Sequence, residues 1–85
     1  MSNSISLAKL RERFARDKKA SKHLSEIQNY AVALSIWRGS KSRLNEVHKD
    51  EAIVALVNVL GEEHLRKVNK IILSMISEEG AVCTK

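Results

Sequence analysis

The residues of this 85-residue sequence that are best suited to bind a ligand are basic ones gathered near its start. Positions 1–23 hold seven Lys or Arg residues and two acidic ones, whereas positions 24–85 hold eight of each, so the formal charge of +5 belongs to the N-terminal segment. Basic side chains along a helix neutralise phosphates and release counterions, which gives salt-sensitive and weakly sequence-dependent binding. We therefore expect nucleic-acid contacts from Lys9, Arg11, Arg13, Arg16, Lys18, Lys19 and Lys22.

A second basic group follows in the clearest loop of the chain, where Arg38, Lys41 and Arg43 alternate with Gly and Ser. We expect these three residues to extend the nucleic-acid-binding surface. Two other interpretations of the basic N-terminal segment stay open. It can dock on an acidic protein, because complementary charge speeds encounter, or it can be an ordinary solvated helix, because Lys and Arg are good helix formers.

The residues that usually carry catalysis or hold metals lack the required spacing. His23, His48 and His64 are far apart in the sequence, and each is interpreted as a solvated surface histidine. The single cysteine, Cys83, allows neither an internal disulfide nor a zinc site of the usual Cys/His pattern. No glycine-rich phosphate loop is present. We expect a non-enzymatic protein with no catalytic residue, metal or cofactor.

The elements that must position the basic residues are helices. Proline is absent and glycine occurs three times, so turn formers are scarce and helix formers dominate. The pattern predicts an all-α fold, a compact bundle or orthogonal array of about four helices in a single domain, with residues 1–3 and 81–85 as flexible tails. The predicted helices run from about Ser4 to Lys19, Leu24 to Arg38, Ser42 to Leu60, and between Gly61 and Gly80.

The first predicted helix carries a narrow apolar stripe of Leu7, Leu10 and Phe14 between two basic flanks. Such a stripe is typical of a helix docked along one edge of a bundle and largely solvated. We expect a break near Ser21, because the stripe changes its position on the helical wheel there. A continuous helix through this point is the alternative.

The second and third predicted helices are apolar on nearly all sides, which is more apolar surface than so short a chain easily covers. We expect the surplus to form a homodimer or a hydrophobic partner interface. The residues expected there are Val32, Ile36, Trp37, Val54 and Val57.

A helix-turn-helix centred on Gly61 is a weaker hypothesis, because its second helix would open with Glu62 and Glu63 facing phosphates. The N-terminus lacks the basic-then-apolar pattern of a secretory signal, and the one cysteine favours a reducing, cytoplasmic location. The sequence thus predicts a cytoplasmic, nucleic-acid-associated regulatory protein without a membrane or small-molecule partner. The alternative is an adaptor, inhibitor or antirepressor that binds another regulator through an apolar helical surface.

Overall fold

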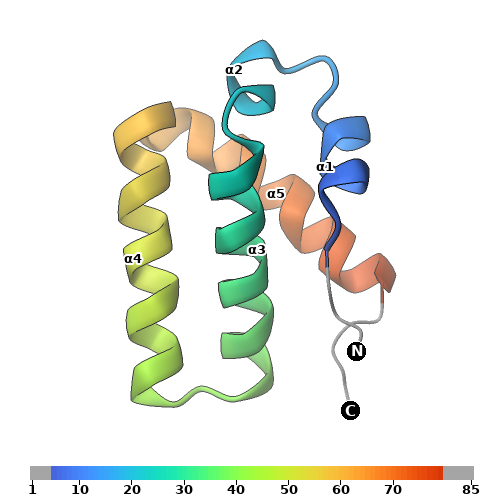
Figure 1. Ribbon diagram of the computed structural model, residues 1–85. Helices are drawn as coiled ribbons and strands as arrows, with labels where there is room; N and C mark the ends of the chain where they lie inside the picture. Colours follow the sequence, from blue (N-terminus) through green and yellow to red (C-terminus); the bar gives the residue numbers. More distant parts are fainter. Residues whose placement is uncertain (1–4, 80–85) are drawn as a thin grey trace.

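The computed structural model describes residues 5–79, and all the regular secondary structure in this range is α-helical (Figure 1). The all-α class predicted from composition is confirmed. The helices are α1 (Leu7–Arg13), α2 (Lys18–Ser21), α3 (Leu24–Gly39), α4 (Arg43–Leu60) and α5 (Glu62–Glu79). The predicted tails at 1–3 and 81–85, and Cys83 with them, lie outside the described residues.

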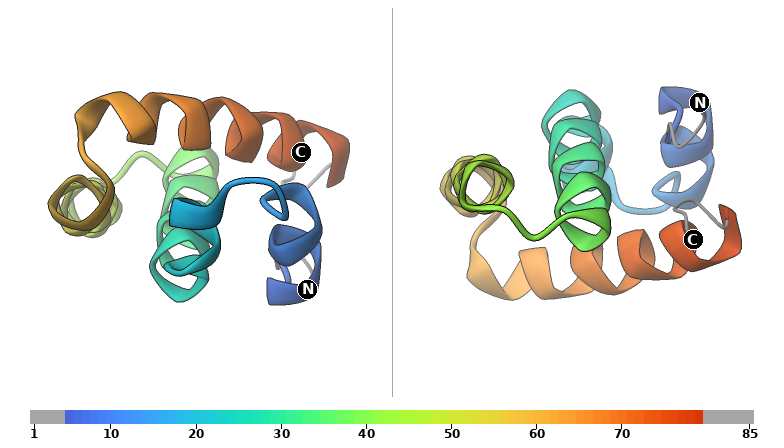
Figure 2. Two further views of the ribbon diagram at one scale, coloured as in Figure 1. Left: turned by 90° about the horizontal axis from the view of Figure 1, so that it is seen from above. Right: turned by 90° about the horizontal axis from the view of Figure 1, so that it is seen from below.

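Three of the helices lie side by side, and α5 crosses obliquely behind them (Figure 2). The central one is α3, which contacts each of the other four helices. Its neighbours α4 and α1 flank it, and the turn at α2 covers its first residues (Figure 1). The core forms where the layers meet, from fully buried side chains such as Ile27 of α3, Leu56 of α4 and Ile72 of α5. The second predicted helix thus corresponds to α3, the central helix of the core.

The single helix predicted from Ser4 to Lys19 is wrong, because the segment is split into α1 and α2. Helix α1 ends at Phe14, whose φ and ψ of −105° and 21° leave the helical region. A straight helix cannot direct both Phe14 and Ala20 into the core, and the turn between α1 and α2 buries both. The predicted stripe shifts as well. Ile5 is buried, at 2% exposure, while Leu7 is 37% exposed.

The break predicted near Ser21 is confirmed, since α2 ends there and α3 begins at Leu24. The long helix predicted from about Ser42 to Leu60 is also present as α4, continuous through Asp50. Gly61 ends α4 with a φ of 91°, a left-handed value that glycine adopts without a steric penalty. This turn sends the chain into α5 behind the other helices.

Two side-chain hydrogen bonds attach other parts of the chain to α3. The Tyr30 hydroxyl of α3 hydrogen-bonds to Asn69 Oδ1 of α5, and burial raises the pKa of Tyr30. The Gln28 amide donates to the carbonyl of Ile5 over 2.8 Å, which fastens the segment before α1 onto α3. Among the described helices, none combines the length and the apolar character needed to cross a membrane.

Candidate functional site

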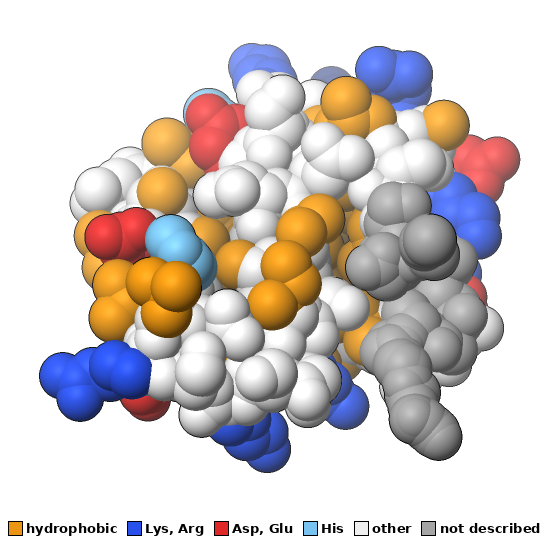
Figure 3. Space-filling view, turned by 60° about the horizontal axis from the view of Figure 1, so that its bottom comes forward, with side chains coloured by type: hydrophobic (Ala, Val, Ile, Leu, Met, Phe, Trp, Pro, Cys, Tyr) orange, Lys and Arg blue, Asp and Glu red, His pale blue; other side chains and the backbone are white. Residues whose placement is uncertain are grey.

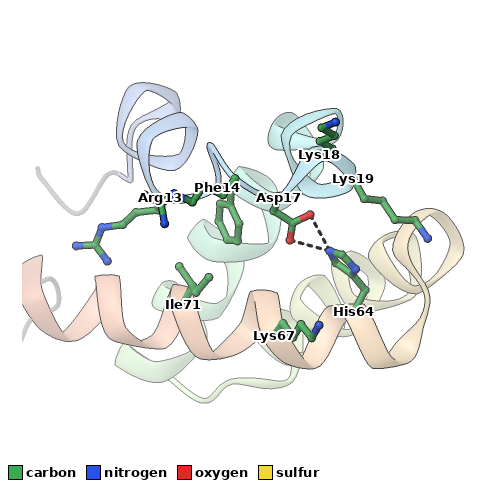
Figure 4. A pocket seen from close by; sticks show the side chains of 9 residues that line it. Arg13, Phe14, Asp17, Lys18, Lys19, His64, Lys67 and Ile71 are labelled. Atoms are coloured by element: carbon green, nitrogen blue, oxygen red, sulfur yellow. Dashed lines mark hydrogen bonds and ion pairs between the residues drawn. The ribbon is translucent and has the colours of Figure 1, made fainter.

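The segment from α1 to α2 docks on α5 through three contacts that are evenly spaced along α5. Asp17 binds His64, and Phe14 lies beside Ile71 (Figure 4). Arg13 pairs with Glu78 near the end of α5. Positions 64, 71 and 78 are seven residues apart, about two helical turns, so they fall on one side of α5. The α1–α2 segment is therefore held along α5 by two ion pairs with an apolar contact between them.

A shallow hollow of about 580 Å³ opens between this segment and α5. Its wall contains the apolar side chains of Phe14 and Ile71, and its rim is dominated by cations. The ionisable residues that line it are Arg13, Arg16, Asp17, Lys18, Lys19, His64 and Lys67. Basic residues from the N-terminal segment thus meet a basic residue of the last helix around one concavity (Figure 4).

Asp17 and His64 form the central polar contact of the hollow. The imidazole Nε2 lies 2.8 Å and 3.0 Å from the two carboxylate oxygens of Asp17. An ionised carboxylate only accepts hydrogen bonds, so Nε2 carries the proton and donates it. Both side chains are about one-quarter exposed. The prediction that His64 is a solvated surface residue is therefore wrong.

Asp17 also begins α2, because its Oδ1 accepts a hydrogen bond from the backbone N–H of Ala20 over 3.0 Å. Burial by itself raises the pKa of this carboxyl. The hydrogen bond from Ala20 and the hydrogen bond and charge of His64 outweigh burial, so the pKa of Asp17 lies below its usual value of 3.8. The carboxylate is thus kept ionised, and it fixes both the start of α2 and the position of α5.

Four cations at the rim are available to a ligand. Arg16, Lys18, Lys19 and Lys67 are exposed and make no ion pair within residues 5–79. Arg13 differs from them, since its guanidinium already binds Glu78. Like charges held without internal neutralisation create a positive potential that attracts anions.

The remaining N-terminal cations lie outside the hollow. Lys9 and Arg11 are exposed on α1, and Lys22 is exposed directly after α2. Lys67 was missed by sequence reasoning, because it belongs to a segment of zero net charge. The available signal was its position in α5, one turn after His64 and at the margin of the apolar face.

Arg38, Lys41 and Arg43 do not extend this surface. They lie around the turn between α3 and α4, at the opposite end of α3 from α2 (Figure 1). A helix of 16 residues is about 24 Å long, so the two basic groups are well separated. Lys41 Nζ also lies 5.0 Å from the centre of the Trp37 ring, a cation–π contact within this second group.

The residues predicted to form an apolar interface are divided between surface and core. Ile36 and Val54 are 48% and 59% exposed, whereas Val32 is half-buried and Trp37 and Val57 pack against the core. Leu44 and Val47 of α4 are further exposed apolar residues. On the face drawn in Figure 3 the apolar side chains lie in separate patches, with backbone and other side chains between them.

Comparison of the chain with protein-family models, with curated proteins and with solved structures gave no match. The function is therefore inferred from the charges and geometry described above.

Proposed function

We propose that this protein is a non-enzymatic, nucleic-acid-associated regulator that contacts the phosphate backbone through the basic surface around the hollow between α2 and α5. One observation carries the proposal. Lys67 of α5 meets Arg16, Lys18 and Lys19 from the other end of the chain around one concavity, and these cations lack acidic partners within residues 5–79. Lys and Arg side chains in such an arrangement are suited to neighbouring phosphates of a strand. A cytoplasmic location belongs to the same proposal.

The test compares the two basic groups by removing equal charge from each. The hollow variant removes three positive charges from the rim of the hollow by Arg16→Gln, Lys18→Gln and Lys19→Gln. The turn variant removes three positive charges from the α3–α4 turn by Arg38→Gln, Lys41→Gln and Arg43→Gln. Affinity for a fluorescent duplex and for a single strand is measured by anisotropy from low to physiological salt. The plot of log K against log salt has a negative slope, and each lost phosphate contact on duplex reduces the magnitude of that slope by about 0.9.

We expect the hollow variant to lose most of its affinity, and its salt dependence to fall by the amount expected for up to three phosphate contacts. The affinity and salt dependence of the turn variant should stay close to those of the parent protein. Circular dichroism confirms that both variants are folded. Binding that does not depend on salt, or an equal loss in both variants, contradicts the proposed surface. Arg13 is left unchanged because its replacement also breaks the pair with Glu78.

The second candidate is a protein-binding adaptor or a homodimer that uses exposed apolar side chains. The observation that favours it is the exposure of Ile36, Leu44 and Val54 on α3 and α4. Val54→Asp tests this function better than substitutions of Trp37 or Val57, which pack against the core and whose loss would disturb the fold. If the chain dimerises through this face, light scattering of the parent protein gives a dimer mass and Val54→Asp gives a monomer.

A further inference from the structure

We propose that the hollow between α2 and α5 is a subsite for one phosphate group, and that its affinity is controlled by protonation of His64. This inference rests on the proposed nucleic-acid binding and adds the position of one contact and its regulation.

The lining of the hollow includes a negative charge that opposes the binding of an anion. Within residues 5–79, Asp17 is the one acidic residue that lines it, and its ionised carboxylate repels a phosphate held by Arg16, Lys18, Lys19 or Lys67. The structure gives a reason for an acid at this place, because Asp17 begins α2 and binds α5. His64 is in direct contact with that carboxylate, so protonation of the imidazole cancels the repelling charge where it arises.

The charges facing His64 come from every element around it. From the α1–α2 segment the hollow is faced by Arg13, Arg16, Asp17, Lys18 and Lys19, and from α5 by Lys67. Glu62 and Glu63, at the start of α5, line an adjoining hollow together with His64, Lys19 and Lys67. Arg13 is paired with Glu78 and adds little net charge. His64 therefore has both positive and negative charges around it, and one proton on its imidazole raises the local net charge by one unit.

The direction of the effect follows from this charge count. Histidine is the side chain whose ordinary titration falls between pH 5 and 8. When the His64 imidazole is protonated, it neutralises the charge of Asp17, and the rim attracts phosphate most strongly. When the imidazole is neutral, the charge of Asp17 is uncompensated. One charge at about 3–6 Å changes affinity by about threefold to tenfold in the water-like dielectric, about 80, of a shallow, open hollow. Because linkage is reciprocal, phosphate binding also draws a proton onto the protein.

Asp17→Asn provides the sharpest test. Asn begins helices as well as Asp does, so the substitution keeps the start of α2 while it removes the negative charge. The variant at pH 8 then carries the same local charge as the parent protein with His64 protonated. We expect it to bind a short duplex at pH 8 about as tightly as the parent binds at pH 6, and to depend less on pH. An affinity at pH 8 no higher than that of the parent protein overturns the inference.

His64→Gln is the complementary variant, because Gln retains a neutral donor toward Asp17 but cannot gain a proton. We expect its affinity to stay at the parent's pH 8 level from pH 6 to pH 8. His48→Gln, at an exposed position on α4, is the matched control and should keep the parent's pH dependence. A pH dependence that survives His64→Gln, or one that disappears in His48→Gln, contradicts the proposal.

Lys67→Gln and Lys70→Gln locate the phosphate contact. Both lysines are exposed on α5, but only Lys67 lines the hollow. We expect Lys67→Gln to weaken duplex binding about threefold more than Lys70→Gln, since one phosphate contact is lost. Inorganic phosphate at millimolar concentration should compete for this contact in the parent protein and have less effect in Lys67→Gln. Equal losses in the two variants contradict the subsite.

The two proposals fail in different ways. If the parent protein shows no salt-dependent binding to duplex or single strand at pH 6, the proposed function is wrong and the inference falls with it. If binding is salt-dependent but pH-independent between pH 6 and 8, the function stands and the subsite control by His64 is refuted. Calorimetry in buffers of different ionisation enthalpy gives a further check, because proton uptake on binding is expected in the parent and not in His64→Gln.

Discussion

Truncation of Ile5 and truncation of Leu7 should have very different costs, although both remove three carbon atoms from neighbouring positions. Ile5 is 2% exposed and Leu7 is 37% exposed. A buried methylene contributes about 0.8 kcal/mol, so Ile5→Ala loses about 2.4 kcal/mol of transfer free energy. The cavity left behind adds to this, which gives a total of about 3 kcal/mol.

Leu7→Ala should cost about 1 kcal/mol or less, because part of the side chain is already in water and Ala has a slightly better helix propensity. The difference between the two variants is therefore about 2 kcal/mol. In a domain of this size that separates their melting temperatures by roughly 8–16 °C. Thermal unfolding followed by circular dichroism, with urea unfolding as a second measurement, gives both values.

The comparison distinguishes two structures of the N-terminal segment. In one continuous helix, Leu7 would continue the stripe of Leu10 and Phe14 and be the costlier residue to truncate. In the fold described here the chain enters α1 from a buried Ile5 whose carbonyl accepts the Gln28 amide. Equal costs for the two variants, or a larger cost for Leu7→Ala, would refute the assignment of Ile5 to the core.

Three other predictions concern stability. Gly61→Ala should destabilise by about 1 kcal/mol in urea unfolding, because the φ of 91° is strained for alanine. Within residues 5–79, no atom beyond the chain neighbours of Gly61 lies within 4 Å of the added Cβ, so a clash is not the cause. Gly39→Ala, also in open space but without a positive φ, should not destabilise. The lowered pKa of Asp17 means that the folded state holds this proton less tightly than the unfolded chain does. The contribution of the Asp17 carboxylate to stability should be complete above the usual pKa of 3.8 and be lost as the pH falls below that value. In Asp17→Asn the free energy of unfolding should therefore depend less on pH in this acid range. Tyr30→Phe should cost about 1–2 kcal/mol, since Asn69 loses its partner in a partly buried place, and an unchanged urea midpoint would show that the bond adds no stability.

Much of the helical framework was predictable from local sequence. The bounds of α3 and α4 agree with the predicted helices to within one residue at each end. Helix-forming residues fill several turns of each, and the runs end in Gly39 and Gly61. The location of the excess charge in residues 1–23 is likewise a property of composition alone.

The tertiary structure decided how the N-terminal segment is divided and which cations share a surface. The turn at positions 14–17 buries Phe14 and Ala20 together and brings Asp17 to His64, a partner 47 residues away. No local pattern encodes such a contact. For the same reason Lys67 joins the N-terminal cations around the hollow. The basic turn at 38–43, although nearer to them in sequence, is carried to the far end of the molecule by the length of α3.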